Sequence, residues 1–131
     1  MENSEKTVRM FMTEAEKIIS LPPYSSIEQA RKILESGRLN SILIPPPTNG
    51  SLWRIFTSSD LAISLAQHLD NNKAKIEDFC RIATKVANPT WSLPFTLDIM
   101  AENGIQHMPV FENNQLIGII SIHDIFRHLN D

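Results

Sequence analysis

A hydroxyl and a carboxylate three residues apart, Ser121 and Asp124, follow one apolar run and precede another. The run 116–120 is rich in β-branched residues, which predicts a strand. Ile125 and Leu129 are four residues apart, which predicts a helix that begins near the aspartate. The first amides of a helix lack intrahelical acceptors and carry partial positive charge, so this junction suits a phosphorylated sugar. The alternative interpretation is that both side chains only cap the helix.

The same pattern occurs earlier in the chain, where Thr57 and Asp60 separate the apolar run 52–56 from a second helical pattern. Upstream of these junctions, Gly37 corresponds to Gly104 at an offset of 67 residues. The offset is 64 at the two aspartates, which predicts three extra residues between the last two strands of the first repeat. An internal duplication therefore organises the chain.

Each repeat is expected to run strand, helix, strand, strand, helix. In the first repeat the pattern predicts strands at 18–20, 41–44 and 52–56, helices at 25–37 and 60–69, and an exposed proline-rich loop at 45–50. In the second repeat it predicts strands at 82–87, 107–111 and 116–121 and helices at 92–104 and 124–129, with a hairpin turn at Asn113 and Asn114. Ser25 and Glu28 have the spacing of a capping box for the first helix.

A short apolar lead-in precedes each repeat. Its members recur at an offset of 68 residues: Val8, Phe11 and Met12 before the first repeat, and Ile76, Phe79 and Cys80 before the second. We therefore expect each repeat to have its own lead-in segment, which gives repeats at residues 8–70 and 76–130.

These patterns resemble a tandem pair of CBS domains, named after cystathionine β-synthase and often called a Bateman module. The segment 118–124 is close to the closing motif of that family, and Met108, Pro109 and Val110 resemble its middle strand. The resemblance covers about residues 8–130. It implies an α+β (α/β mixed) fold with two β-α-β-β-α repeats, 8–70 and 76–130, packed about a pseudo-two-fold axis into one module.

The resemblance also implies clefts between the repeats that hold an adenosine nucleotide such as AMP, ADP or ATP. The aspartate of each junction would accept hydrogen bonds from the ribose hydroxyls, and the Thr or Ser hydroxyl would lie toward the phosphates. The residues placed there are Asp124, Ser121 and His123 in the second repeat, and Asp60, Thr57 and Ser59 in the first.

The base and the phosphates need further side chains. The apolar slot would be lined by Thr84, Val86, Met108 and Pro109 in the second repeat and by Ile18, Ser20, Ser41 and Ile42 in the first. His107 could give a charge-assisted bond to a phosphate, or it could be a half-exposed strand histidine. Asn40 would take its place in the first repeat and could donate only neutral hydrogen bonds.

Two functional hypotheses follow. The first is a regulatory module that senses an adenosine nucleotide, with the Asp124 site as the tighter one. The second is a protein-interaction or oligomerisation module that keeps the CBS fold without a ligand. It draws on Arg54, which stands where the family prefers the glycine found at Gly118, and on the neighbouring tri-proline loop. Either module is expected to form a homodimer through its apolar helices and to act on an effector protein in trans.

Composition and residue spacing also limit which partners, location and chemistry we expect for this protein. A net charge of −3 and a pI near 5.8 argue against a nucleic-acid partner. Cys80 is the only cysteine, the first residues lack the layout of a signal peptide, and no apolar run is long enough for a membrane span, so we expect a cytoplasmic protein. The four histidines have no zinc-like spacing and glycine-rich phosphate loops are absent, so we expect no enzyme activity, no metal and no required cofactor.

Overall fold

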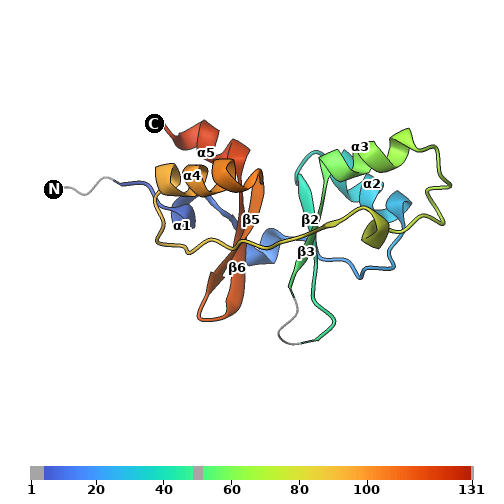
Figure 1. The fold of residues 1–131 in the computed structure, drawn as a ribbon, viewed down its shortest axis with the longest axis horizontal. Helices are drawn as coiled ribbons and strands as arrows, with labels where there is room; N and C mark the ends of the chain where they lie inside the picture. Colours follow the sequence, from blue (N-terminus) through green and yellow to red (C-terminus); the bar gives the residue numbers. More distant parts are fainter. Residues whose placement is uncertain (1–4, 49–51, 131) are drawn as a thin grey trace. The chain divides into compact units, whose positions relative to one another are not determined.

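A computed structural model describes residues 5–48 and 52–130, so Asn49 and Gly50 of the predicted loop lie outside the described residues. The contacts within the chain form two compact units, drawn in Figure 1. The first unit joins the N-terminal segment up to Ile18 with the chain from Lys85 onward, and the second spans Ile19–Thr84. Both units combine helices with an antiparallel sheet, and the fold is α+β.

The first unit is built on the sheet β1-β6-β5. Its elements are α1 (Val8–Phe11), β1 (Thr13–Glu14), the 3-10 helix η1 (Ala15–Lys17), α4 (Leu93–Asn103), β5 (His107–Glu112), β6 (Gln115–Ser121) and α5 (Ile122–His128). Ala87 adds a parallel bridge to β5 at Val110. Asn113 and Asn114 both have positive φ angles, 53° and 64°, which confirms the predicted turn between β5 and β6.

Helices α4 and α5 contact each other and, with α1, bury the core of this unit (Figure 1). The fully buried residues are Val8, Leu93, Met100, Met108, Val110, Ile120 and Ile125. Helix α4 begins at Ser92, whose Oγ accepts the Phe95 amide at 3.1 Å, and ends at Gly104 with φ of 63°. Serine before the helix and a left-handed glycine after it are the expected boundary signals.

The second unit has the same plan, with the sheet β2-β3-β4. Its elements are α2 (Ile27–Glu35), β2 (Ser41–Ile44), β3 (Arg54–Thr57), α3 (Ser58–Ala66), the 3-10 helix η2 (Ile76–Asp78) and β4 (Arg81–Ile82). Ser20 makes a parallel bridge to Leu43 at the edge of β2. Helices α2 and α3 contact each other, and Ile27, Ile42, Phe56 and Ile76 are fully buried in the core.

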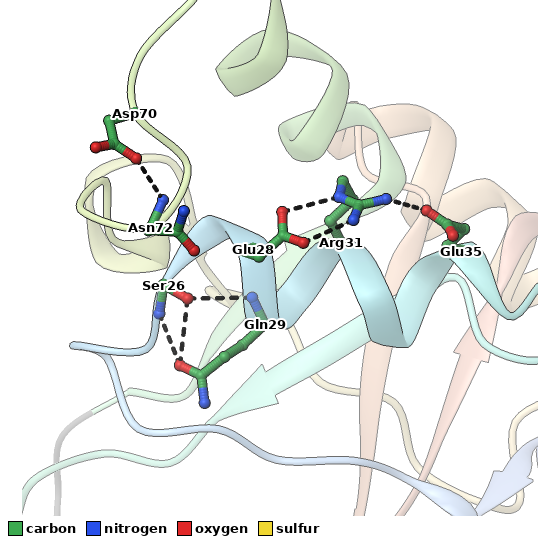
Figure 2. Close-up of polar contacts among 7 residues, drawn as sticks. All are labelled: Ser26, Glu28, Gln29, Arg31, Glu35, Asp70 and Asn72. Atoms are coloured by element: carbon green, nitrogen blue, oxygen red, sulfur yellow. Dashed lines mark hydrogen bonds and ion pairs between the residues drawn. The ribbon is translucent and has the colours of Figure 1, made fainter.

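The cap of α2 differs from the prediction. Ser26, one residue later than expected, is the N-cap, and its Oγ accepts the Gln29 amide at 3.1 Å while Gln29 reaches back to the Ser26 amide (Figure 2). Glu28 instead accepts from Arg31 at 2.6 and 3.0 Å, and Arg31 also pairs with Glu35 (Figure 2). Ser25 is buried, and its carbonyl accepts a hydrogen bond from the Ile76 amide.

The lead-in segments are exchanged between the two repeats, unlike the expected boundaries at 8–70 and 76–130. The Val8 amide donates to the Trp91 carbonyl, and the Ile76 amide donates to the Ser25 carbonyl, both at 2.9 Å. Val8 lies in the core of the first unit and Ile76 in the core of the second. Each lead-in therefore completes the core of the repeat to which it is not adjacent in sequence.

The structural offset between the repeats also differs from the predicted one. The N-caps Ser26 and Ser92 and the strand starts Ser41 and His107 are both related by 66 residues, and the junction hydroxyls by 64. The first repeat therefore has two extra residues between its last strands, not three. Helix α4 has 11 residues where α2 has 9, and the loop after it is shorter by the same amount.

The strands predicted at 18–20 and 82–87 are mostly wrong. Only the bridges of Ser20 and Ala87 and the two-residue strand β4 remain of them. The helices expected at 60–69 and 124–129 start two residues earlier, because the junction hydroxyls themselves are their N-caps.

Candidate functional site

The junction between β6 and α5 is a complete capping box. The Ser121 Oγ accepts the Asp124 amide at 3.1 Å, and Asp124 Oδ2 accepts the Ser121 amide at 2.9 Å. Asp124 is half-buried, and no group in residues 5–48 and 52–130 donates to its other oxygen, Oδ1. The cap therefore uses half of this carboxylate and leaves the other half able to accept hydrogen bonds from a ligand.

The junction between β3 and α3 has the same box but a different carboxylate. Asp60 Oδ2 accepts from the Thr57 amide at 2.8 Å and from the Thr57 Oγ1 at 3.1 Å. Its Oδ1 accepts from Arg81 Nε on β4 at 3.3 Å. Asp60 is 1% exposed, so both of its oxygens are engaged below the surface.

The strand register decides which residue faces each junction. His107 is the antiparallel partner of Ser121, and Ser41 is the partner of Thr57. The counterpart of His107 is therefore Ser41, and the expectation that Asn40 takes that place is wrong by one residue. Asn40 corresponds to Gln106, since the carbonyls of both accept the first amide of the following helix, at 3.3 and 2.8 Å.

Gly118 on β6 packs against the N-terminal lead-in segment, which leaves no room for a side chain. A Cβ at Gly118 would lie 2.6 Å from the Thr13 carbonyl oxygen and 2.7 Å from the Met12 Sδ. The glycine at this position therefore allows the lead-in segment to approach β6 closely.

In the second unit Arg54 stands at the corresponding position, and Cys80 stands where Met12 does. Burial raises the pKa of the Cys80 thiol, and the nearby Asp60 carboxylate adds to this, whereas the neighbouring Arg54 guanidinium acts in the opposite direction. Arg54 therefore lies beside a cysteine, whereas Gly118 lies beside a methionine.

The other predicted site residues divide by exposure. Met108 and Ile42 are fully buried in the two cores, so neither side chain lines an open slot. Pro109, on the opposite face of β5 from Met108, and Ser41 are also buried, while Ile18 and His107 are half-buried. Thr84, Val86, Ser20, Ser59, Asn40 and His123 are exposed, and the His123 ring meets Phe126 edge-on with 6.4 Å between centroids.

Arg81 was missed by the sequence analysis. Its signal is weak, because it becomes visible only when the two lead-ins are compared and Arg81 is matched with Thr13 at an offset of 68.

Within the described ranges, no group of three or more His, Cys, Asp or Glu side chains could hold a metal ion. Among the helices of those ranges, none has the length and apolar character needed to cross a membrane.

Comparison with known proteins agrees with this architecture. Residues 76–131 match the family model of the CBS domain. The CBS domain-containing protein YhcV of Bacillus subtilis is 21% identical over 113 residues, which are 86% of this chain and 79% of that protein. The hexameric CBS-CP12 protein from bloom-forming cyanobacteria superposes with a TM-score of 0.85 at 20% identity, over 95% of this chain and 71% of that one.

A second solved structure carries ligands. The CBS domain pair of protein MJ0100, in complex with 5′-methylthioadenosine and S-adenosyl-L-methionine, has a TM-score of 0.77 and 27% identity, over 95% of this chain and 96% of that one. CBS domain pairs are known as ligand-binding regulatory modules. The present chain is a tandem CBS-domain protein.

Proposed function

We propose that this chain is a regulatory module that binds an adenosine-containing ligand, such as AMP, ADP or ATP, at the Asp124 junction and passes the signal to a partner protein. The observation that carries the proposal is Oδ1 of Asp124, a half-buried carboxylate oxygen near the Ser121 hydroxyl that accepts no hydrogen bond from the part of the chain that the structure describes. A carboxylate oxygen with open lone pairs suits the adjacent hydroxyls of a ribose. The adenosine ligands of the MJ0100 domain pair support the same ligand class.

His107 adds a phosphate-facing role to this proposal. It lies directly opposite Ser121 in the β5–β6 ladder, so an imidazolium there would give charge-assisted hydrogen bonds to a phosphate near the hydroxyl. Ser41, at the corresponding position of the second unit, brings no charge. The Asp124 junction is therefore proposed as the tighter of the two.

Calorimetric titration with AMP and ATP tests the proposal on the wild type, Asp124→Ala and Asp60→Ala. Loss of the ligand-binding carboxylate should weaken binding about ten- to a hundred-fold in Asp124→Ala, since a charge-assisted hydrogen bond contributes about 1.5–3 kcal/mol. Asp60→Ala, which removes an equivalent cap, is the matched control and should leave the tightest binding nearly unchanged. Equal losses in both variants would contradict the ranking of the sites.

A thermal-shift series separates this function from its alternative. A ligand that binds only the folded chain must raise the melting temperature. No shift with millimolar AMP, ADP, ATP, NAD or S-adenosylmethionine would contradict the sensing function and favour a ligand-free interaction module.

One observation favours such an interaction role beside ligand binding. Large apolar side chains are exposed on or just after α3 and on α5, namely Ile63 at 48%, Leu65 at 37%, Leu69 at 47% and Phe126 at 57%. Exposed apolar surface of this kind is typical of interfaces, and we propose a homodimer. Light scattering at micromolar concentration should give twice 14.9 kDa, and a mass near 14.9 kDa would contradict the dimer.

A further inference from the structure

Arg81 distinguishes the two junctions more sharply than any residue of the junction motif. It lies on β4 as the antiparallel partner of Ile55, and its side chain is 68% exposed. From there its Nε reaches Asp60 Oδ1 at 3.3 Å. The carboxylate that it contacts is 1% exposed, so the guanidinium acts on a buried anion from the solvent side.

Both oxygens of the Asp60 carboxylate already accept hydrogen bonds, and the residue is 1% exposed. Oδ2 already accepts two hydrogen bonds from Thr57, and Oδ1 accepts the one from Arg81. A ribose at this junction would have to displace the guanidinium and then satisfy a buried charge with two neutral hydroxyls. The guanidinium brings a positive charge to the buried carboxylate and a ribose hydroxyl does not, so this exchange is unfavourable.

The first unit lacks such a group at the same place. Thr13 on β1 pairs with Ile119, as Arg81 on β4 pairs with Ile55. A threonine carries no charge, and Oδ1 of Asp124 is without a donor among the described residues. The two junctions thus share their backbone plan, and at this place the lead-in supplies arginine to one and threonine to the other.

We propose that Arg81 closes the Asp60 junction to ribose, so that the chain binds one adenosine ligand instead of two. The inference rests on the proposed function, because it assumes that an open junction carboxylate binds ribose. Arg81 is a specificity-determining residue in this sense: it decides which of two duplicated junctions is open. Its counterpart Thr13 leaves the Asp124 junction accessible.

Exchanging the two lead-in residues tests the proposal. The variant Arg81→Thr gives the second unit the residue that the first unit has at this position. The variant Thr13→Arg gives the first unit the residue of the second. Arg81→Met keeps the aliphatic stem and removes only the charged head. Lys73→Thr removes one positive charge from an exposed turn of the same unit and is the matched control, since the Lys73 side chain makes no hydrogen bond or ion pair with the described residues.

The readout is the number of AMP and adenosine molecules bound per chain, measured by isothermal titration calorimetry and native mass spectrometry, with folding followed by circular dichroism. The wild type and Lys73→Thr should bind one molecule, and Arg81→Thr and Arg81→Met should bind two. Adding Asp60→Ala to Arg81→Thr should remove the second molecule. Thr13→Arg should weaken the remaining site at least ten-fold.

The outcomes separate this inference from the proposed function. A wild type that binds two molecules, or an Arg81→Thr variant that binds no more than the wild type, overturns the role of Arg81. A wild type that binds none overturns the proposed Asp124 site. If Arg81→Thr then gains one molecule that depends on Asp60, the closing role of Arg81 is still supported, and if it gains none, that role is overturned as well.

Discussion

Replacing Val8 by alanine should destabilise the first unit, although Val8 precedes the first repeat in sequence. The side chain is fully buried against the core that contains Met100, Met108 and Ile125. The change removes two methyl groups, which corresponds to about 1.6 kcal/mol of transfer free energy, and the remaining cavity adds to this. We expect the free energy of unfolding to fall by roughly 1.5–3 kcal/mol. Met10→Ala, at a side chain that is 63% exposed, should cost far less and is the control.

Two measurements check this prediction. Urea unfolding gives the loss of stability, and hydrogen exchange under native conditions locates it. In Val8→Ala, amide protection should fall in α4, β5 and β6, whereas α2 and β2 should change little. A loss below about 0.5 kcal/mol, or weakened protection centred on α2 and β2, would show that the lead-in belongs to the first repeat, as the sequence alone suggested.

Two further predictions concern a strand glycine and an ion pair. Gly118→Ala should lower the free energy of unfolding by about 1–3 kcal/mol in urea, because its Cβ would meet the Thr13 carbonyl at 2.6 Å, and an unchanged midpoint would contradict that contact. Hydrogen bonds from Arg31 lower the pKa of Glu28 below its ordinary value of 4.5. The stabilisation from this pair is therefore full above pH 4.5 and is lost as the pH falls through the lower pKa of the folded state. The difference in melting temperature between wild type and Glu28→Gln should shrink below pH 4.5, and a difference that grows there would contradict this sign.

Signals that lie close together in sequence predicted most of the fold. The repeated hydroxyl-x-x-aspartate pattern located both strand–helix junctions, and the structure confirms them as capping boxes. Asn113 and Asn114 located the hairpin, and Gly104 located the end of α4. Each of these features needs residues only a few positions apart, so the pattern alone contains the necessary information.

The errors arose where distant segments meet. Sequence spacing could not show that Val8 completes the core around Met100, because the two are joined only through tertiary packing. The sequence analysis matched Asn40 instead of Ser41 with His107, because it used the spacing of 67 residues between the two glycines. Helix α4 is two residues longer than α2 and the loop after it is two residues shorter, so the strands that follow are related by 66 residues. The Asp60–Arg81 contact joins residues 21 positions apart that no local motif connects.

The same exchange of lead-ins explains how two duplicated junctions can differ while their motifs stay alike. The backbone of each junction is fixed by its own capping box, so substitutions elsewhere leave that geometry intact. The lead-in segments supply the neighbours that vary. Met12 lies against Gly118, whereas Cys80 at the corresponding position lies beside Arg54. Thr13 corresponds to Arg81, which donates to Asp60. Each lead-in packs on one repeat but is adjacent in sequence to the other. A sequence comparison that assigns each lead-in to the repeat that follows it therefore matches each junction with the lead-in that packs on the other junction. Besides the ladder partners His107 and Ser41, the junctions therefore differ through the lead-in residues Thr13 and Arg81. Exchanging these two lead-in residues should change the number of ligands bound without altering either junction motif.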